Sequence, residues 1–470
     1  MLFNSLVFLL FAAVFYPVFL GLRSQRARLG VLTAASFVFY GFWDPRFLLL
    51  LLATGLLDFW AALAIVRYPQ RKKAFLLASM SANVGALAFF KYAGFFLDNV
   101  DAFAKALGLP GTGFAFHVVL PVGISFYTFQ SMSYTIDVYS GRLTPTRSVL
   151  HFLASLSLFP HLVAGPIVRA STLLPQIETR RDPASAQVWE GWRLIVRGYV
   201  KKCFVADTLA AYVNAAFSGD PAAHSAAYWW LSSAMFAVQI YGDFSGYTDI
   251  AIGLAKWMGL ELPKNFEHPY LARSFREFWQ RWHISLSSWF RDYVYIPLGG
   301  AEGGPVRAHA NLWATMLLSG LWHGASWNFL LWGALHAAFM SLERITRWPE
   351  RLKPWGAAGG ALSLGLVFPL TLVSWVLFRA SNLGQAGAIL ARMADLGTLL
   401  DFADALDGRR FGVVVLGLVF LRHLYVGLNV REWCDERLPM DTLRVALAAA
   451  GVLVAVYLRG PGQQFIYFQF

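Results

Sequence analysis

The chain has 470 residues, of which 57% are hydrophobic, 16% aromatic and only 14% charged. Soluble domains carry roughly a quarter charged residues, so this chain lacks the polar surface that a water-soluble body of its size needs. The composition excludes soluble enzymes, disordered chains and fibrous repeats, and it indicates a protein that crosses a membrane several times. The net charge of +12 does not indicate nucleic-acid binding, because the basic residues gather in short loops between apolar spans, as cytoplasmic loops do.

The first part of the chain is predicted to alternate across the membrane. Met1 to Leu22 is interpreted as a retained first span, since no basic residue precedes it and no small-residue cleavage site follows it. Basic loops at 23–28 and 67–73 then place the N-terminus outside the cell. Further spans are predicted at about 29–42, 47–66, 74–97 and 118–139.

Residues 151–168 are apolar but are interrupted by Pro160, Gly165 and Pro166, with basic residues on both flanks. A full crossing would break the alternation of the spans. We therefore expect a broken, re-entrant hairpin, because such backbone is tolerated at membrane depth only where it is buried in protein or lines a cavity.

Residues 273–293 carry aromatic side chains at helical spacing, whereas Arg276, His283 and Arg291 share the opposite face. This pattern is typical of an amphipathic helix in the membrane interface, and we expect it on the cytoplasmic side. The remaining membrane segments are predicted at 189–217, 226–257, 309–345 (a hairpin or a pair of spans), 357–379, 411–428 and 442–458. The total is about 11 segments, with the C-terminus outside.

His323 is the sharpest candidate for chemistry, since Leu321-Trp322-His323-Gly324 stands inside an apolar stretch. An ionisable side chain at membrane depth is costly and suggests a functional site. An imidazole can also accept a proton near pH 7. The alternative is a histidine that hydrogen-bonds a neighbouring helix, as expected for His336, and position alone leaves both interpretations open.

Polar residues on two other segments have similarly open interpretations. His283 is either an interface residue or a catalyst, and Arg276, Arg281 and Arg291 beside it would contact lipid phosphates or the phosphates of a substrate. The second segment, 239–249, places Gln239, Asp243 and Gly246 on one helical face.

Gly242 and Gly246 form a GxxxG pair that allows another helix to approach closely. Asp243, at membrane depth, must be paired, and arginine or histidine partners are plausible. A purely structural role and a direct catalytic role for Asp243 are both compatible with the pattern.

Several long motifs, in order, resemble the membrane-bound O-acyltransferase family, and the alginate O-acetylation branch is the nearest likeness. They are 120–130, 159–167, 239–249, 278–300 and Trp322-His323-Gly324. The likeness covers nearly the whole chain as one domain over 1–470, with core motifs at about 118–345.

The resemblance implies an all-α polytopic membrane protein whose tilted helices, with re-entrant and interfacial helices, surround a central tunnel. It implies that His323 is the catalytic base and His283 the second catalytic position. The residues expected to support the tunnel are Gln239, Asp243, Tyr247, Asp249, Trp322 and Asn328. A donor for the developing oxyanion is also needed, and Trp, Asn or backbone N–H groups near 322–328 could supply it.

The last residues, 464–470, are rich in Phe and Tyr, and we expect this tail to tuck into the membrane or the protein. One interpretation is an interfacial anchor, since aromatic residues prefer that zone. The other, helped by similar C-terminal motifs in the family's cell-envelope systems, is that Tyr467 accepts the acyl group and presents it outside.

The favoured function is transfer of an acetyl group across the bacterial inner membrane for O-acetylation of an exopolysaccharide such as alginate. The donor would be acetyl-CoA or an acyl-carrier thioester, with no bound cofactor or metal, and the resemblance implies a periplasmic SGNH-type acetyltransferase partner besides membrane lipids. Alternatives are D-alanyl transfer from a carrier protein to teichoic acid and, from another class, a transporter or channel. Cys203 and Cys434 show neither a disulfide framework nor metal-ligand spacing.

Overall fold

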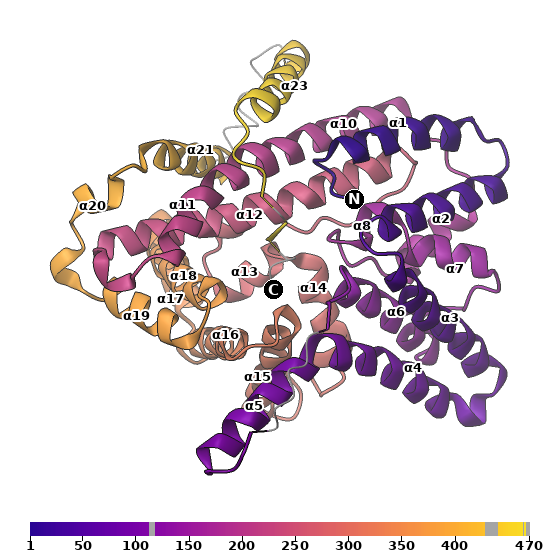
Figure 1. Ribbon diagram of the computed structural model, residues 1–470, viewed down its shortest axis with the longest axis horizontal. Coiled ribbons are helices and arrows are strands. Elements are labelled where there is room, and N and C mark those ends of the chain that lie inside the picture. Colours follow the sequence, from indigo (N-terminus) through magenta and orange to yellow (C-terminus); the bar gives the residue numbers. More distant parts are fainter. Residues whose placement is uncertain (112–117, 428–439, 464, 467–470) are drawn as a thin grey trace. The chain divides into compact units, whose positions relative to one another are not determined.

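The computed structural model describes the chain except residues 112–117, 428–439, 464 and 467–470 (Figure 1). Regular structure in the described part is helical throughout, which confirms the predicted all-α class. The chain divides into two compact units, each described below by itself. Unit 1 comprises Met1–Ile195 and Ile250–Pro263, and unit 2 comprises Val196–Asp249 and Lys264–Phe470. The assignment of one family domain to 1–470 stays a prediction.

Unit 1 contains α1 (Leu6–Gly21), α2 (Gln25–Gly41), α3 (Arg46–Arg67), α4 (Lys72–Leu87), α5 (Ala93–Ala106), α6 (Ile124–Tyr139), α7 (Val149–Leu156), α8 (Phe159–Leu162), α9 (Ala170–Glu178) and most of α10 (Ser185–Tyr199). A π-helical turn, Ala88–Tyr92, joins α4 to α5. Asp58 on α3 accepts hydrogen bonds from Ser79 and Asn83 on α4 and from Ser131 on α6. Because a buried carboxylate is costly without such donors, this cluster holds the three helices in register.

The predicted broken segment at 151–168 is confirmed as broken and buried. The chain runs through α7 and α8 and then continues without regular structure to residue 169. A Cβ atom on Gly165 would lie 2.3 Å from the Cα of His161, so the backbone folds back on itself too closely for any other residue.

Unit 2 contains a π-helical stretch η3 (Val200–Ala206), α11 (Asp207–Ser218), most of α12 (Ala226–Lys256), α13 (Phe275–Arg281), α14 (Ile284–Phe290), a π-helical turn (Arg291–Tyr295), α15 (Pro305–His323), α16 (Trp327–Thr346), α17 (Trp348–Leu352), α18 (Gly356–Arg379), α19 (Leu383–Met393), α20 (Phe402–Leu406), α21 (Arg410–Gly427) and α23 (Met440–Tyr457). Short 3-10 turns occur at Pro69–Arg71 in unit 1 and at Pro221–Ala223, Pro269–Leu271, Lys353–Trp355 and Leu396–Thr398 in unit 2.

The predicted hairpin over 309–345 is confirmed as α15 and α16, which pack side by side (Figure 1). Two glycines permit the contact. A Cβ on Gly320 would lie 2.2 Å from the carbonyl oxygen of Phe329, and one on Gly333 would lie 2.4 Å from that of Met316. The helices therefore approach backbone to backbone, and this places the end of α15 deep in unit 2.

The prediction of one amphipathic helix over 273–293 is wrong. The helix ends at Arg281 and restarts at Ile284, and His283 between them adopts the left-handed conformation with φ 43°. This break turns His283 away from the face it would share with Arg276 and Arg291, and its side chain is fully buried. The two arginines stay exposed, as predicted for the polar face.

Three helical stretches in the described residues are long and apolar enough to cross a membrane: Arg46–Arg67, Pro69–Ala106 and Trp348–Arg379. The shorter α1 is also apolar. The second stretch runs beyond the predicted span at 74–97, since the helix continues through Asp98 and Asp101 to Ala106. The total of about 11 membrane segments and the central tunnel stay predictions.

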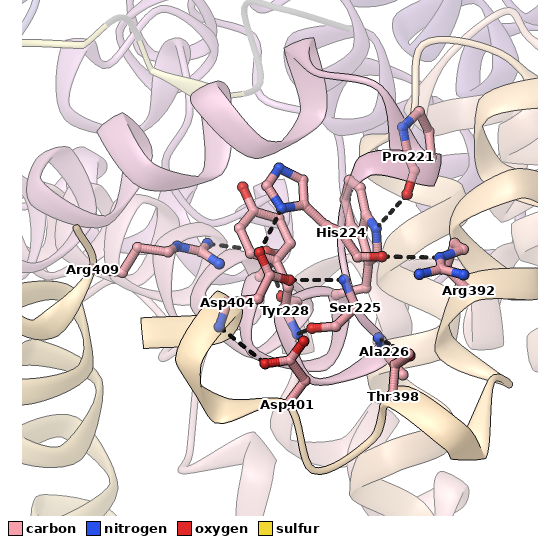
Figure 2. A network of polar contacts seen from close by, with 12 residues as sticks. Pro221, His224, Ser225, Ala226, Tyr228, Arg392, Thr398, Asp401, Asp404 and Arg409 are labelled. Atoms are coloured by element: carbon pink, nitrogen blue, oxygen red, sulfur yellow. Dashed lines mark hydrogen bonds and ion pairs between the residues drawn. The ribbon is translucent and has the colours of Figure 1, made fainter. Parts of the chain in front are cut away.

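A network of polar contacts fixes the start of α12 to the segment before α21 (Figure 2). The imidazole Nδ1 of His224 lies 2.9 Å from one carboxylate oxygen of Asp404, and the backbone N–H of Ser225 donates to the other at 2.8 Å. His224 stacks on Tyr228, whose ring also faces the guanidinium of Arg409 at 4.2 Å. Partial burial raises the pKa of Asp404, but these hydrogen bonds outweigh it and hold the pKa below its ordinary value of 3.8.

Candidate active site

His323 is the last residue of α15 and is only 4% exposed. Aromatic rings surround its imidazole: the ring centroids of Trp322 and Trp332 lie 5.0 Å away and that of Phe378 lies 5.1 Å away. These rings come from α15, α16 and α18, so three helices build the environment of one side chain. Because these rings surround it, the imidazole of His323 is shielded from bulk water.

His336, on the next helix, hydrogen-bonds a neighbouring helix, as predicted. Its Nε2 lies 3.1 Å from the hydroxyl of Ser374 on α18 and it is fully buried. His336 therefore ties α16 to α18.

His283 occupies the break between α13 and α14. Its Nδ1 lies 3.2 Å from the amide oxygen of Asn265, which also accepts hydrogen bonds from the backbone and hydroxyl of Ser285. Since Asn265 presents an acceptor, His283 carries its proton on Nδ1 and has its basic lone pair on Nε2. Sequence reasoning missed Asn265, because nothing nearby in the sequence marks its contact with a residue 18 positions away.

The two histidines lie on either side of one indole. The ring centroid of Trp322 is 5.8 Å from that of His283 and 5.0 Å from that of His323. Both predicted catalytic residues are thus brought together in unit 2, although 40 residues separate them in the sequence.

Asp243 lies in the middle of α12 and is paired, as predicted, but its partner is a lysine. The ammonium of Lys202 lies 2.8 Å from Asp243 and 2.9 Å from Asp207, and all three side chains are almost fully buried. Sequence reasoning named arginine or histidine as the partner and missed Lys202. The signal was the pair Lys201-Lys202 inside the apolar segment 189–217, since a charge at that depth indicates a partner.

Close helix contact at Gly242 and Gly246 is confirmed. A Cβ on Gly246 would lie 2.8 Å from the carbonyl oxygen of Gly198, and one on Gly242 would lie 3.1 Å from that of Lys201. The backbone of α10 and η3 therefore rests directly on α12, and this brings Lys202 within reach of Asp243.

The tail of the chain enters unit 2 beside this ion pair. Gly460 donates its backbone N–H to the carbonyl of Cys203 at 2.9 Å, Lys202 donates to the carbonyl of Gln463 at 3.1 Å, and the backbone N–H of Ile466 donates to Asp243 at 2.7 Å. Phe465 and Ile466 are each 1% exposed. The expectation that the tail tucks into the protein is confirmed for these residues, whereas Tyr467 lies outside the described part.

Phe465 of the tail and His283 both contact the ring of Phe244. Phe465 lies 4.9 Å from Tyr247 and 5.9 Å from Phe244, centroid to centroid, and Phe244 lies 4.6 Å from His283. Tyr247 is therefore part of the wall against which the tail packs.

The other predicted site residues have these positions. Asp249 is paired with Arg197 and Lys201 at 2.8 Å, Asn328 donates to the carbonyl of Ala380 at 2.7 Å, and Gln239 is buried on α12. Arg281 pairs with Glu277 and Arg291 with Asp292, each at 2.7 Å, and Arg276 is exposed. The amide of Asn328 thus joins α16 to the end of α18.

Comparison with known proteins places this geometry in a family. Residues 146–356 match the model of the membrane-bound O-acyltransferase family. The chain is 37% identical to a probable alginate O-acetylase AlgI of Pseudomonas putida over the full length of both proteins. It is 40% identical to a probable alginate O-acetylase AlgI of Pseudomonas aeruginosa, over 96% of this chain and 85% of that protein.

A more distant relative is a peptidoglycan O-acetyltransferase of Helicobacter pylori, 34% identical over 78% of this chain and 73% of that protein. The match to the family model contains His283 and His323, and the apolar helices fit a protein of the membrane. The chain therefore belongs to the membrane-bound O-acyltransferase family and is an O-acyltransferase.

Proposed function

We propose that this enzyme moves an acetyl group from a thioester donor to a hydroxyl acceptor, with His323 as the general base, and that the acetyl group is destined for a polysaccharide. The observation that carries the proposal is the pair of buried imidazoles on either side of Trp322. The names of the relatives, alginate O-acetylases and a peptidoglycan O-acetyltransferase, support acetyl as the group and a cell-envelope polysaccharide as the destination.

The reaction needs one proton acceptor and one electrophile. The imidazole of His323 removes the proton of the acceptor hydroxyl as its oxygen attacks the thioester carbonyl. The tetrahedral intermediate collapses with cleavage of the carbon–sulfur bond, and the imidazolium returns the proton to the leaving thiolate. The free thiol and the new ester are the products.

His283 is the second polar group in this scheme. The amide oxygen of Asn265 fixes its tautomer, so its Nε2 is the nitrogen that can accept or relay a proton. We assign it to the relay of the acceptor's proton to His323.

Tyr467 is the proposed first acceptor. It directly follows Ile466, whose backbone is bound to Asp243, and Phe465 lies one ring from His283. Acylation of its phenol oxygen would give an aryl ester with the loss of the phenol proton to His323. A second hydroxyl, on the polymer or on an outer partner, would then take the acyl group and return a proton to the phenol.

The membrane setting of this proposal is a bacterial inner membrane with both ends of the chain outside the cytoplasm. The donor, acetyl-CoA or an acyl-carrier protein, would act from the cytoplasmic side, and an SGNH-type acetyltransferase outside would complete the transfer. The distribution of basic loops supports this orientation.

The test uses purified protein in detergent with acetyl-labelled acetyl-CoA. Release of free CoA and label on the protein are measured for the wild type, for His323→Ala and for His309→Ala. His309 is the matched control because it lies on α15 too but contacts Ser341 near the other end of that helix. We expect turnover in the wild type and the control, and a loss of at least 100-fold in His323→Ala.

Peptide mass analysis then locates the label. Label on Tyr467 that is absent from His323→Ala supports the relay, and CoA release without any labelled peptide overturns it while retaining the enzyme. Wild-type rates in His323→Ala would overturn the assignment of the base. Turnover only with a D-alanyl carrier protein would replace acetyl as the transferred group.

A further inference from the structure

Helix α5 continues a helical stretch that is longer than a membrane is thick. The stretch Pro69–Ala106 has 38 residues and is therefore about 57 Å long, whereas the core of a bilayer is about 30 Å thick. A tilt of about 40° still leaves about 44 Å across the bilayer. A crossing that begins at Lys72 needs about 20 residues and so ends near the π-helical turn Ala88–Tyr92. The whole of α5 follows that turn and lies beyond the core.

The apolar stripe of α5 is a row of exposed side chains along one face of the helix. Its members recur at helical spacing and are 36–67% exposed: Phe96, Val100, Phe103 and Leu107, the last directly after the end of the helix. Side chains of this size and polarity are rarely left in water together as one continuous row.

The charges of α5 lie on the opposite face. Asp98, Asp101 and Lys105 are about half a turn around the helix from Phe103. Asp101 and Lys105 form an ion pair at 2.6 Å on that face. A helix divided in this way suits the boundary between lipid and water.

The rest of unit 1 does not cover the apolar stripe. No residue of α5 is buried in the part of the chain that the structure describes. The helix leads away from α3, α4 and α6 (Figure 1). Because an isolated helix of this length is only marginally stable in water, α5 needs a surface that its apolar side chains can enter.

The apolar stripe continues an exposed apolar face of α4. Leu77 and Val84 are exposed there and lie seven residues apart, and the same interval separates Phe89, Phe96 and Phe103. The step from Val84 to Phe89 is five residues, which is the number that a π-helical turn takes up, so the row stays aligned across the turn. This continuity favours lipid over a protein partner, because α4 is part of a stretch that is able to cross the membrane.

We propose that α5 lies in the plane of the membrane interface, at the end of α4 away from Lys72, with its apolar stripe in the lipid and its charges toward water. The surface that the stripe binds is the lipid itself. The π-helical turn is the point where the chain changes from crossing the membrane to lying along it, since such turns are common places for a helix to bend. α5 thereby holds the end of α4 at the depth of the interface.

The experiment places nitroxide spin labels at single cysteines of the full chain in phosphatidylglycerol nanodiscs, in the background Cys203→Ser/Cys434→Ser. Phe103→Cys carries the label on the apolar stripe, and Lys105→Cys is the matched control on the charged face. Both positions are exposed, so the label displaces no buried side chain. Collision of each label with oxygen, which concentrates in lipid, and with a water-soluble nickel chelate is then measured.

We expect Phe103→Cys to collide more with oxygen than with the chelate, and Lys105→Cys to show the reverse. Labels at Phe96→Cys and Leu107→Cys then measure the depth of the two ends of the helix. These depths should agree within about 5 Å, because a helix in the interface lies at one level. A helix that continued across the bilayer would separate them by about 12–16 Å, and that result would overturn the proposal.

Two further results would contradict a position in the interface. Strong collision with the nickel chelate at both Phe103→Cys and Lys105→Cys would place α5 in water. Weak collision with both reagents at Phe103→Cys would show that a protein surface, such as a second copy of the chain, covers the apolar stripe. Opposite accessibilities of the two faces, at one shared depth, would support the proposal.

Discussion

Ile466 donates its backbone N–H to the carboxylate of Asp243 at 2.7 Å, across 223 residues of sequence. The same carboxylate is paired with Lys202, which in turn donates to the carbonyl of Gln463. The ion pair thus binds the tail by one donor and one acceptor of the main chain, and it joins α12, η3 and the tail in one buried contact.

Removing Lys202 should cost more than removing Asp243, because Lys202 bridges the buried carboxylates of Asp243 and Asp207. Asp243→Leu leaves the Lys202–Asp207 pair and takes the acceptor from the N–H of Ile466, so we expect a loss of about 1–3 kcal/mol in the free energy of unfolding. Lys202→Met leaves two buried carboxylates without their cation and should cost about 3–5 kcal/mol. The double variant Asp243→Leu/Lys202→Met should lose less than the sum of the single variants, with a coupling of about 0.5–3 kcal/mol. Denaturant unfolding in detergent measures this, and strict additivity would contradict the pairing.

Substitution of Gly246 should separate α12 from α10. A Cβ there meets the backbone oxygen of Gly198 at 2.8 Å, so Gly246→Ala should lower the free energy of unfolding by about 1–3 kcal/mol. Gly417→Ala on α21 is the control, because its Cβ would enter open space. Thermal unfolding of the two variants should move in opposite directions, since alanine is the better helix former. An unchanged midpoint in Gly246→Ala would show that the helices can separate freely.

His283 combines a special backbone with a proposed chemical role, and the two can be tested separately. His283→Asn accommodates φ 43° and should fold with a stability within about 1 kcal/mol of the wild type. Acetyl transfer should nevertheless fall by about 100-fold or more, because a proton acceptor is lost. A variant with normal stability and normal turnover would leave His283 with a structural role only.

The contribution of Asp404 to the free energy of unfolding should decrease as the pH falls into the acid range. Hydrogen bonds from Ser225 and His224 lower its pKa in the folded protein, so its contribution is present above the ordinary value of 3.8 and is lost as pH falls through the lower folded value. Asp404→Asn should therefore be less stable than the wild type by about 0.5–1 kcal/mol near neutral pH, the range for partly exposed pairs. The difference should disappear in unfolding measurements below that pKa, and one that persists in acid would contradict this origin.

Elements with strong local signals could be predicted from the sequence. The hairpin of α15 and α16 follows from two apolar stretches on either side of His323, and the break near Pro160 follows from proline and glycine. His323 could be named because a histidine in an apolar stretch is rare. These features depend on residues close together in the chain, where periodicity and helix breakers act directly.

The features that could not be predicted depend on distant contacts or on an unusual backbone angle. The pattern over 273–293 keeps its helical period on both sides of the break, and a left-handed histidine has no sequence signature, so one helix was expected where two exist. Lys202 and Asp243 are 41 positions apart, and no rule of spacing connects them. The same holds for Asn265 and His283.

The contacts of 460–466 with Cys203, Lys202 and Asp243 use backbone atoms of the tail at Gly460, Gln463 and Ile466. Side-chain substitutions between these points leave such hydrogen bonds intact, but an inserted or deleted residue shifts every later group relative to its partner. The number of residues between Gly460 and Ile466 therefore determines whether all three backbone contacts can form at once. Substitutions in this segment should therefore be tolerated better than insertions or deletions, because the contacts use backbone atoms.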